Sequence, residues 1–250
     1  MNRSRGWTEA APGFFRLCTA EVNCYLVRKE DGLTLFDAGL PRTRGVLRSA
    51  LAKLGARMTD IQAVVLTHGH FDHVGLARGI HRDGARVLVH SDDAHLARHP
   101  YSYRPATPRV PYLLSHPRGI PVIGRMALDG ALAVRGVEAS GTVAHGHRVD
   151  VPGAPLALWT PGHTAGHCSY LFEEEGILLT GDALVTLDPY TGEKGPQIVA
   201  SAATADVEQS MRSLDVIEET SARLLLPGHG TPHREGASAA VEQARRRGPH

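Results

Sequence analysis

Cysteine is scarce in this chain of 250 residues, and the three that occur are scattered. Cys18, Cys24 and Cys168 form no Cys-x-x-Cys pair, which argues against a disulfide framework and against a zinc site built on thiolates. We therefore expect each of them to be a small buried thiol.

The sequence also lacks a strong net charge and a long apolar run. Its formal net charge is +1, which is too small to gather nucleic acid or an anionic membrane. No apolar run is long enough to cross a bilayer, and the N-terminal segment has no apolar core of secretory length. We expect a soluble cytoplasmic protein whose partner is a small-molecule substrate, with no nucleic-acid or membrane partner.

Short apolar runs bounded by Gly, Asp or Pro predict strands along most of the chain. They lie at residues 14–17, 24–27, 33–36, 63–66, 87–89, 156–159, 169–172, 177–179 and 224–226. Helices are predicted at 42–54 and at 203–219, where apolar residues from Val207 to Ile217 recur at spacings of four and three. This alternation indicates sheet layers covered by helices, and the length fits one domain spanning residues 1–250.

Residues 100–130 interrupt this pattern with six prolines, at 100, 105, 108, 111, 117 and 121. We interpret the segment as an insertion that is either a rigid surface loop or a wall of the substrate pocket. Its apolar side chains Tyr101, Tyr103, Tyr112 and Ile120 would favour a substrate with an acyl or aromatic portion. Residues 185–199, which include Tyr190, are expected to form a second wall.

Histidine, by contrast, is abundant, with 15 residues, and it is concentrated in the stretch THGHFDH at residues 67–73. His68 and His70 lie on the same side of an extended segment, whereas His70 and His73 have helical spacing. A strand that ends near residue 67 and turns into a helix near Asp72 would present all four side chains as metal ligands from the tip of a sheet.

Four ligands are too few for two metal ions, and distant segments offer more. His163 in PGHTAGH, Asp182 in TGDA and His229 in PGHG each follow a predicted strand and a glycine, which permits the turn that aims the side chain. His145 and His147 repeat the His-x-His spacing without a following Asp-His, and we interpret them as part of a polar turn.

This ordered set of motifs resembles the metallo-β-lactamase superfamily over nearly the full length of the chain. The resemblance implies an α/β fold, an αββα sandwich, with two metals at one edge of the packed sheets. It assigns His68, His70 and His163 to the first metal, Asp72, His73 and His229 to the second, and Asp182 as the bridge. It also places Asp37 of FDAG beside the ligands, although a turn aspartate that ends a strand is an equal alternative, and it places His167 behind them.

Nitrogen and oxygen ligands without cysteine suit two zinc ions, and Mn²⁺ or Fe²⁺ could use the same set. Two metals sharing a carboxylate would bind a bridging hydroxide, because metal binding lowers the pKa of water from 15.7 toward roughly 7. Asp72, a ligand beside that nucleophile, could also shuttle the proton as a catalytic residue.

Departures from particular relatives narrow the expected reaction. Zinc β-lactamases lack the bridging carboxylate, flavodiiron proteins have glutamate in place of His70, and glyoxalase II has a helical domain for which the residues after His229 are too few. Quorum-quenching lactonases have a tyrosine soon after the bridging aspartate, where this chain has Ala183 to Thr186.

We therefore predict a binuclear hydrolase of a carbonyl ester, thioester or lactone. The sequence does not decide between a monomer and a homodimer, although many relatives are dimers. An N-acyl homoserine lactonase, a mononuclear iron sulfur dioxygenase of the same fold and a metal-stabilised binding module are the alternatives.

Overall fold

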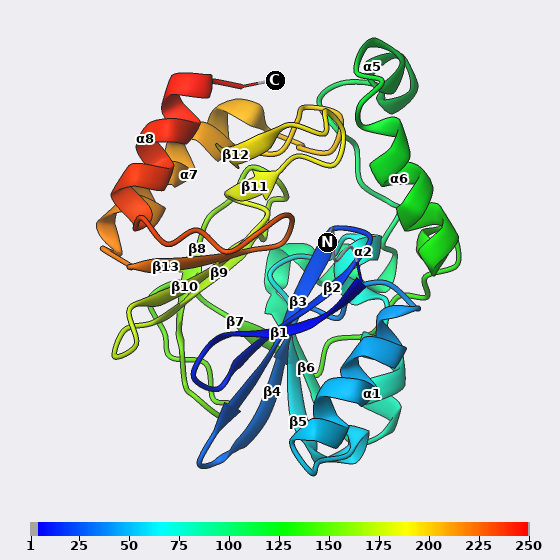
Figure 1. The fold of residues 1–250 in the computed structure, drawn as a ribbon, viewed down its shortest axis with the longest axis vertical. Helices are drawn as coiled ribbons and strands as arrows, with labels where there is room; N and C mark the ends of the chain where they lie inside the picture. The colour runs from blue at the N-terminus through cyan, green and yellow to red at the C-terminus, as the bar shows by residue number, and fades with distance from the viewer. Residues whose placement is uncertain (1–4, 250) are drawn as a thin grey trace. The chain divides into compact units, whose positions relative to one another are not determined.

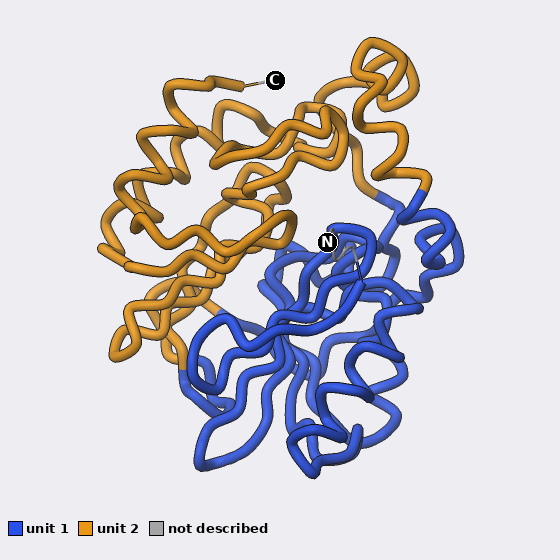
Figure 2. The backbone as a smooth tube through the Cα atoms, viewed as in Figure 1, with its two compact units in different colours: residues 1–102, 125–143, 149–154 blue, residues 103–124, 144–148, 155–250 orange. Residues whose placement is uncertain are grey.

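The computed structural model of the protein describes residues 5–249, and the chain forms two compact units. Unit 1 comprises residues 1–102, 125–143 and 149–154, and unit 2 comprises residues 103–124, 144–148 and 155–250 (Figure 2). The expectation of a single domain stays a prediction. Among the described residues, no helix is both long and apolar enough to span a membrane.

Unit 1 contains a seven-stranded mixed sheet whose strands follow chain order (Figure 1). The first four strands are antiparallel, and the pairs from the fourth to the seventh are parallel. They are β1 (Arg5–Ala11), β2 (Phe14–Thr19), β3 (Val22–Lys29), β4 (Gly32–Phe36), β5 (Ile61–Val65), β6 (Arg86–His90) and β7 (Gly141–Val143). Because β4, β5 and β6 are parallel, their carboxyl ends lie at the same edge of the sheet.

Helices follow each of these parallel strands. They are α1 (Thr43–Lys53), the 3₁₀ turn η1 (Met58–Asp60), α2 (Phe71–Val74), α3 (Ala77–Arg82), the 3₁₀ turn η2 (Ser91–Asp93) and α4 (Ala94–Arg98). Leu47 and Leu51 of α1 and Ile80 of α3 belong to the same buried apolar cluster as Leu26 and Leu35 of the sheet. This packing holds the β4, β5 and β6 ends in place.

Unit 2 contains a four-stranded sheet in the order β13-β10-β9-β8 and a separate two-stranded sheet. The strands are β8 (Leu156–Trp159), β9 (Cys168–Phe172), β10 (Ile177–Gly181), β11 (Val185–Leu187), β12 (Lys194–Gln197) and β13 (Leu224–Pro227). The helices α7 (Val207–Glu219) and α8 (Ala237–Arg247) pack on the larger sheet through a core that includes Leu214, Ile217, Val241, Leu178 and Leu225. β10 and β13 are parallel, so their carboxyl ends also meet at one edge.

The proline-rich residues 100–130 are partly helical, so of the two interpretations the rigid surface loop is wrong for much of the segment. It forms α5 (Arg109–Ser115), α6 (Ile120–Met126) and most of a π-helical turn, η3 (Ala127–Ala131). Pro111 and Pro121 lie in first turns, where a missing N–H breaks no helical hydrogen bond. Proline therefore does not exclude helix at these positions.

All nine predicted strands are present, and the three cysteines are buried free thiols, as expected. The second predicted helix begins later than residue 203. Asp206 caps it by accepting a hydrogen bond from the Gln209 N–H at 2.8 Å, so helical structure starts at Val207.

Candidate metal centre

The histidine cluster lies at the carboxyl end of β5, as the sequence predicted. Val65 is the last residue of the strand, His70 has extended backbone angles at the start of α2, and Asp72 and His73 lie within that short helix. The change from extended chain to helical turn brings the rings of His68 and His73 to 4.0 Å between centroids, and those of His68 and His70 to 4.7 Å.

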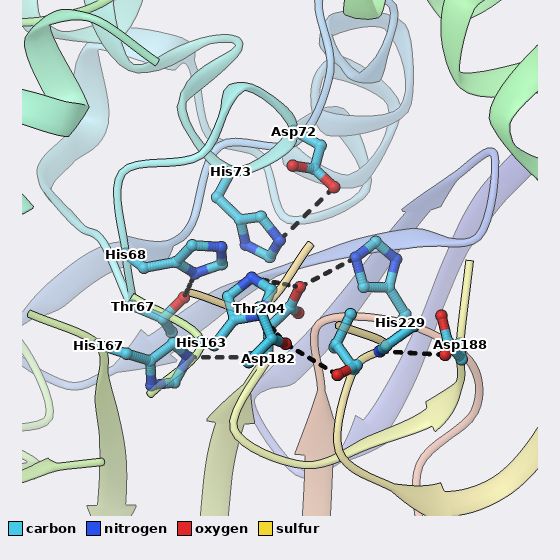
Figure 3. Close-up of polar contacts among 12 residues, drawn as sticks. Thr67, His68, Asp72, His73, His163, His167, Asp182, Asp188, Thr204 and His229 are labelled. Atoms are coloured by element: carbon cyan, nitrogen blue, oxygen red, sulfur yellow. Dashed lines mark hydrogen bonds and ion pairs between the residues drawn. The ribbon is translucent and has the colours of Figure 1, made fainter. Parts of the chain in front are cut away.

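Asp37, directly after β4, orients two of these histidines. Its carboxylate accepts hydrogen bonds from the Thr67 N–H at 2.8 Å and from the Thr67 hydroxyl, and it contacts His73 Nδ1 at 2.9 Å. The Thr67 oxygen in turn lies 2.9 Å from His68 Nδ1 (Figure 3). These contacts assign the ring proton to Nδ1 in both histidines, so that Nε2 is the atom that would bind a metal. Asp37 therefore supports the ligands, and it also ends a strand.

Asp93 holds the backbone between the first two histidines, a role that the sequence did not indicate. The Gly69 N–H donates to Asp93 Oδ2 at 2.8 Å, and Asp93 is buried. A Cβ atom at Gly69 would lie 2.5 Å from the Ala97 nitrogen, so only glycine fits there. Asp93 and Gly69 together fix the path of the chain from His68 to His70.

His163 lies in the loop between β8 and β9. Gly162 has φ +128°, and a Cβ atom there would lie 2.2 Å from the Ser210 nitrogen. The His163 Nδ1 atom lies 3.3 Å from the Thr204 oxygen, and the Thr204 hydroxyl donates to the Val199 carbonyl at 2.8 Å. Thr204 is therefore the acceptor for the Nδ1 proton, and Nε2 is the atom of His163 that would bind a metal.

Asp182 follows β10 and lies close to two imidazoles. Its Oδ2 atom is 3.5 Å from His163 Nε2 and 3.2 Å from His229 Nε2 (Figure 3). His229 follows β13, and the Gly228 N–H donates to the Gly181 carbonyl at 2.8 Å, which ties the two strand ends together. One carboxylate oxygen thus approaches a histidine from each of two loops, as a bridging ligand requires.

His167 supports Asp182 from behind, in agreement with its predicted position. Its Nε2 accepts the Asp182 N–H at 3.0 Å, and its Nδ1 lies 2.9 Å from the Thr160 oxygen. Because Nε2 accepts, the ring proton is on Nδ1 and His167 is a neutral donor to Thr160. Its nitrogens are both engaged in orienting neighbours.

The seven predicted ligands are buried, and their ligand atoms fall into three overlapping groups with all members within 4.8 Å of one another. The groups are His68, His70 and His163; Asp72, His73 and His229; and His68, His73 and Asp182. These donors are imidazole nitrogen and carboxylate oxygen, which fits zinc, manganese or iron. The assignment of one metal ion to the first of these groups and one to the second stays a prediction.

The Tyr101 hydroxyl is engaged in structural hydrogen bonds. It donates to the Ala131 carbonyl at 2.7 Å and accepts the Val134 N–H at 2.9 Å. Burial raises the pKa of Tyr101, the Val134 hydrogen bond opposes this shift, and the charge of Asp72 adds to it. The Tyr101 ring stacks on Phe71 with centroids 5.6 Å apart, so this residue offers an apolar surface.

His145 and His147 form the polar turn that was predicted, and neither belongs to the three groups. His145 Nδ1 accepts the Trp159 N–H at 3.1 Å, and both imidazoles are on exposed residues. Tyr190 lies in a turn and is buried in a cluster with Tyr112, Val185 and Ala200.

Comparison with known proteins places these features in a family. The sequence model of the metallo-beta-lactamase superfamily matches residues 20–229. The probable metallo-hydrolase YflN of Bacillus subtilis is 30% identical, with 92% of this chain and 88% of that protein covered. An N-acyl homoserine lactonase of Bacillus cereus is 24% identical, with 97% and 93% covered.

Solved structures agree with the sequence comparison. A metallo-beta-lactamase family protein from Thermus thermophilus is 27% identical and superimposes with a TM-score of 0.67 over 93% of this chain and 78% of that chain. The predicted fold class is thereby confirmed.

Proposed function

The chain belongs to the metallo-β-lactamase superfamily and is a metallo-hydrolase, and on this premise we propose that it hydrolyses a carbonyl ester, thioester or lactone with two divalent metal ions. The main supporting observation is the position of Asp182, whose Oδ2 lies 3.5 Å from His163 Nε2 and 3.2 Å from His229 Nε2. A site for a single metal ion would not need a carboxylate between His163, predicted for the first metal, and His229, predicted for the second.

Each metal would have three ligands of its own and share the seventh. His68, His70 and His163 would hold one ion, Asp72, His73 and His229 the other, and Asp182 both. Zinc is the proposed metal because the set combines imidazoles with carboxylates and contains no thiolate. Bound divalent ions would supply Lewis acidity, which polarises a carbonyl and lowers the pKa of water.

The chain's own residues would orient the ligands and move the proton. Asp37 and Thr67 accept hydrogen bonds from the Nδ1–H groups of His73 and His68, so the Nε2 atom of each histidine would be the one that binds a metal. The Asp72 carboxylate would accept a proton from water and pass it to the leaving group. The rings of Phe71 and Tyr101 are stacked on each other. Phe71 precedes Asp72 in the chain, and the charge of Asp72 contributes to the raised pKa of Tyr101. These two rings would contact an apolar part of the substrate.

An N-acyl homoserine lactone is the second candidate substrate, because the Bacillus cereus lactonase matches nearly the whole chain. The residues after Asp182 differ from the lactonase pattern, since Ala183, Leu184 and Val185 are buried apolar side chains in the place of a tyrosine. We therefore favour the broader class of esters and thioesters.

A substrate panel tests this proposal. Thioesters, acyl-homoserine lactones, aryl esters and a cephalosporin would be assayed with the zinc and manganese forms, alongside Asp182→Ala and the surface control Asp83→Ala. We expect turnover of at least one carbonyl ester class, strong loss of activity and metal in Asp182→Ala, and neither loss in Asp83→Ala. Full activity in Asp182→Ala would refute the bridging role.

A further inference from the structure

Arg109, the first residue of α5, has a guanidinium whose hydrogen-bonding edge is unsatisfied. Its Nε and Nη2 atoms are buried from solvent and have no hydrogen-bond partner. Its Cζ atom lies over the Tyr103 ring, 4.2 Å from the centroid. Among the residues that the structure describes, no carboxylate forms an ion pair with Arg109, whereas Arg212 pairs with Glu208 on α7.

The contact with Tyr103 leaves that edge available. A cation–π contact uses the face of the guanidinium, whereas its N–H groups point outward in the plane. Nε–H and one Nη2–H are parallel, and this pair of donors matches the two oxygens of a carboxylate. Burial of charged donors without an acceptor costs free energy, so the edge is suited to an anion that the described residues do not supply.

The segment that contains Arg109 is attached to the loop that supports a predicted metal ligand. The Ala106 N–H donates to the Thr204 carbonyl at 2.8 Å, and the Thr107 N–H donates to the Ser201 carbonyl at 3.0 Å. The Thr107 hydroxyl also donates to the Ser201 oxygen at 2.9 Å. Thr204 is the residue whose hydroxyl contacts His163 Nδ1, so hydrogen bonds connect the segment that contains Arg109 to the loop of His163.

We propose that Arg109 binds a carboxylate of the substrate, so that the preferred substrates are esters or thioesters of acids with a second, ionised carboxyl group. This inference rests on the proposed function and specifies its substrate class. A phosphate group fits less well, because its charge of about −1.5 to −2 exceeds the single positive charge of one guanidinium. Entry of the carboxylate requires a shift of α5 or Tyr103. Little packing opposes this shift on one side of α5, where Val110 and Leu114 are 70% and 73% exposed.

A pair of matched substrates tests the inference. The 4-nitrophenyl monoester of glutaric acid carries a free carboxylate, and its methyl ester has the same aryl leaving group without that charge. Both would be assayed with the metal-loaded wild type and with Arg109→Met, Arg109→Lys and Arg104→Met. Arg104 is exposed in the same segment, so Arg104→Met removes an equal charge without the buried edge.

We expect the wild type to prefer the anionic ester, and Arg109→Met to lower the ratio of kcat/KM values, anionic over neutral, by about 10- to 100-fold. Arg109→Lys should lie between them, because an ammonium keeps the charge but lacks the paired donors. Arg104→Met should keep the wild-type ratio. Melting temperatures of all variants would show whether each is folded.

Equal ratios in the wild type and Arg109→Met would overturn the inference while leaving the proposed function intact. Absence of turnover of every ester would instead count against the proposed function. In that case calorimetric binding of glutarate decides the carboxylate site: weaker binding by Arg109→Met and Arg109→Lys than by Arg104→Met would support it, and equal binding by the three would overturn it.

Discussion

Replacing Asp37 with asparagine changes one buried group that orients two predicted ligands. The Asp37 carboxylate accepts hydrogen bonds from the N–H and hydroxyl of Thr67 and lies 2.9 Å from His73 Nδ1. Asparagine has a single acceptor oxygen, so its amide NH₂ must take the place of Oδ1, where it faces the Thr67 N–H, or of Oδ2, where it faces His73 Nδ1. Facing His73, it would favour the tautomer with the proton on Nε2, which cannot bind a metal.

The backbone would tolerate this substitution. Asp37 has φ +56°, a left-handed conformation that asparagine adopts about as readily as aspartate and that alanine does not. The expected effect is therefore on the ligands: loss of such a supporting group lowers metal affinity or activity about 10- to 100-fold, equivalent to about 1.4 to 2.7 kcal/mol.

The assay is metal affinity measured by chelator competition, with kcat/KM for the best ester measured in parallel. Asp31→Asn is the matched control, because Asp31 is exposed and makes a hydrogen bond through its backbone carbonyl. Unchanged metal affinity and activity in Asp37→Asn, with its fold intact by circular dichroism, would refute the role of Asp37 in orienting His73.

Three further predictions concern other parts of the molecule. Thr204→Val removes the acceptor for His163 Nδ1 and should lower metal affinity about tenfold, measured by chelator competition; wild-type affinity would contradict this. The double variant His145→Ala, His147→Ala should keep the wild-type metal content by elemental analysis, because both residues lie outside the ligand groups. Burial, then the charges of Asp188 and Glu193, raises the pKa of Tyr112 to about 12. Folding therefore favours the neutral phenol, and stability should fall as pH rises from about 10 to about 12. Urea unfolding of Tyr112→Phe should show a smaller fall over that range, and an unchanged profile would exclude this contribution.

The strands that the sequence predicted are those with continuous apolar runs. β1, β7, β11 and β12 were not predicted, because their residues have no such run. β1, at the edge of its sheet, has the sequence RGWTEAA, of which only Ala10 is buried. The helices α5 and α6 were not predicted because prolines suggested a loop, although first-turn prolines are compatible with helix.

The predicted ligands could be identified from sequence because each follows a strand and belongs to a short motif. Their supporting residues could not be identified in the same way. Asp93 is 24 positions from Gly69, and Thr204 is 41 positions from His163, so only the folded chain brings them together. Thr67 lies inside the first motif, but its bond to Asp37, 30 positions away, depends on the pairing of β4 with β5. The unsatisfied edge of Arg109 likewise follows from burial and not from a motif.

Metal stoichiometry together with oxygen consumption tests the central claim most directly. Protein purified without added metal, then titrated with zinc, should bind two ions per chain and hydrolyse an ester or thioester without consuming oxygen. One tightly bound iron per chain, with oxygen consumed during turnover of a sulfur substrate, would contradict the binuclear hydrolase.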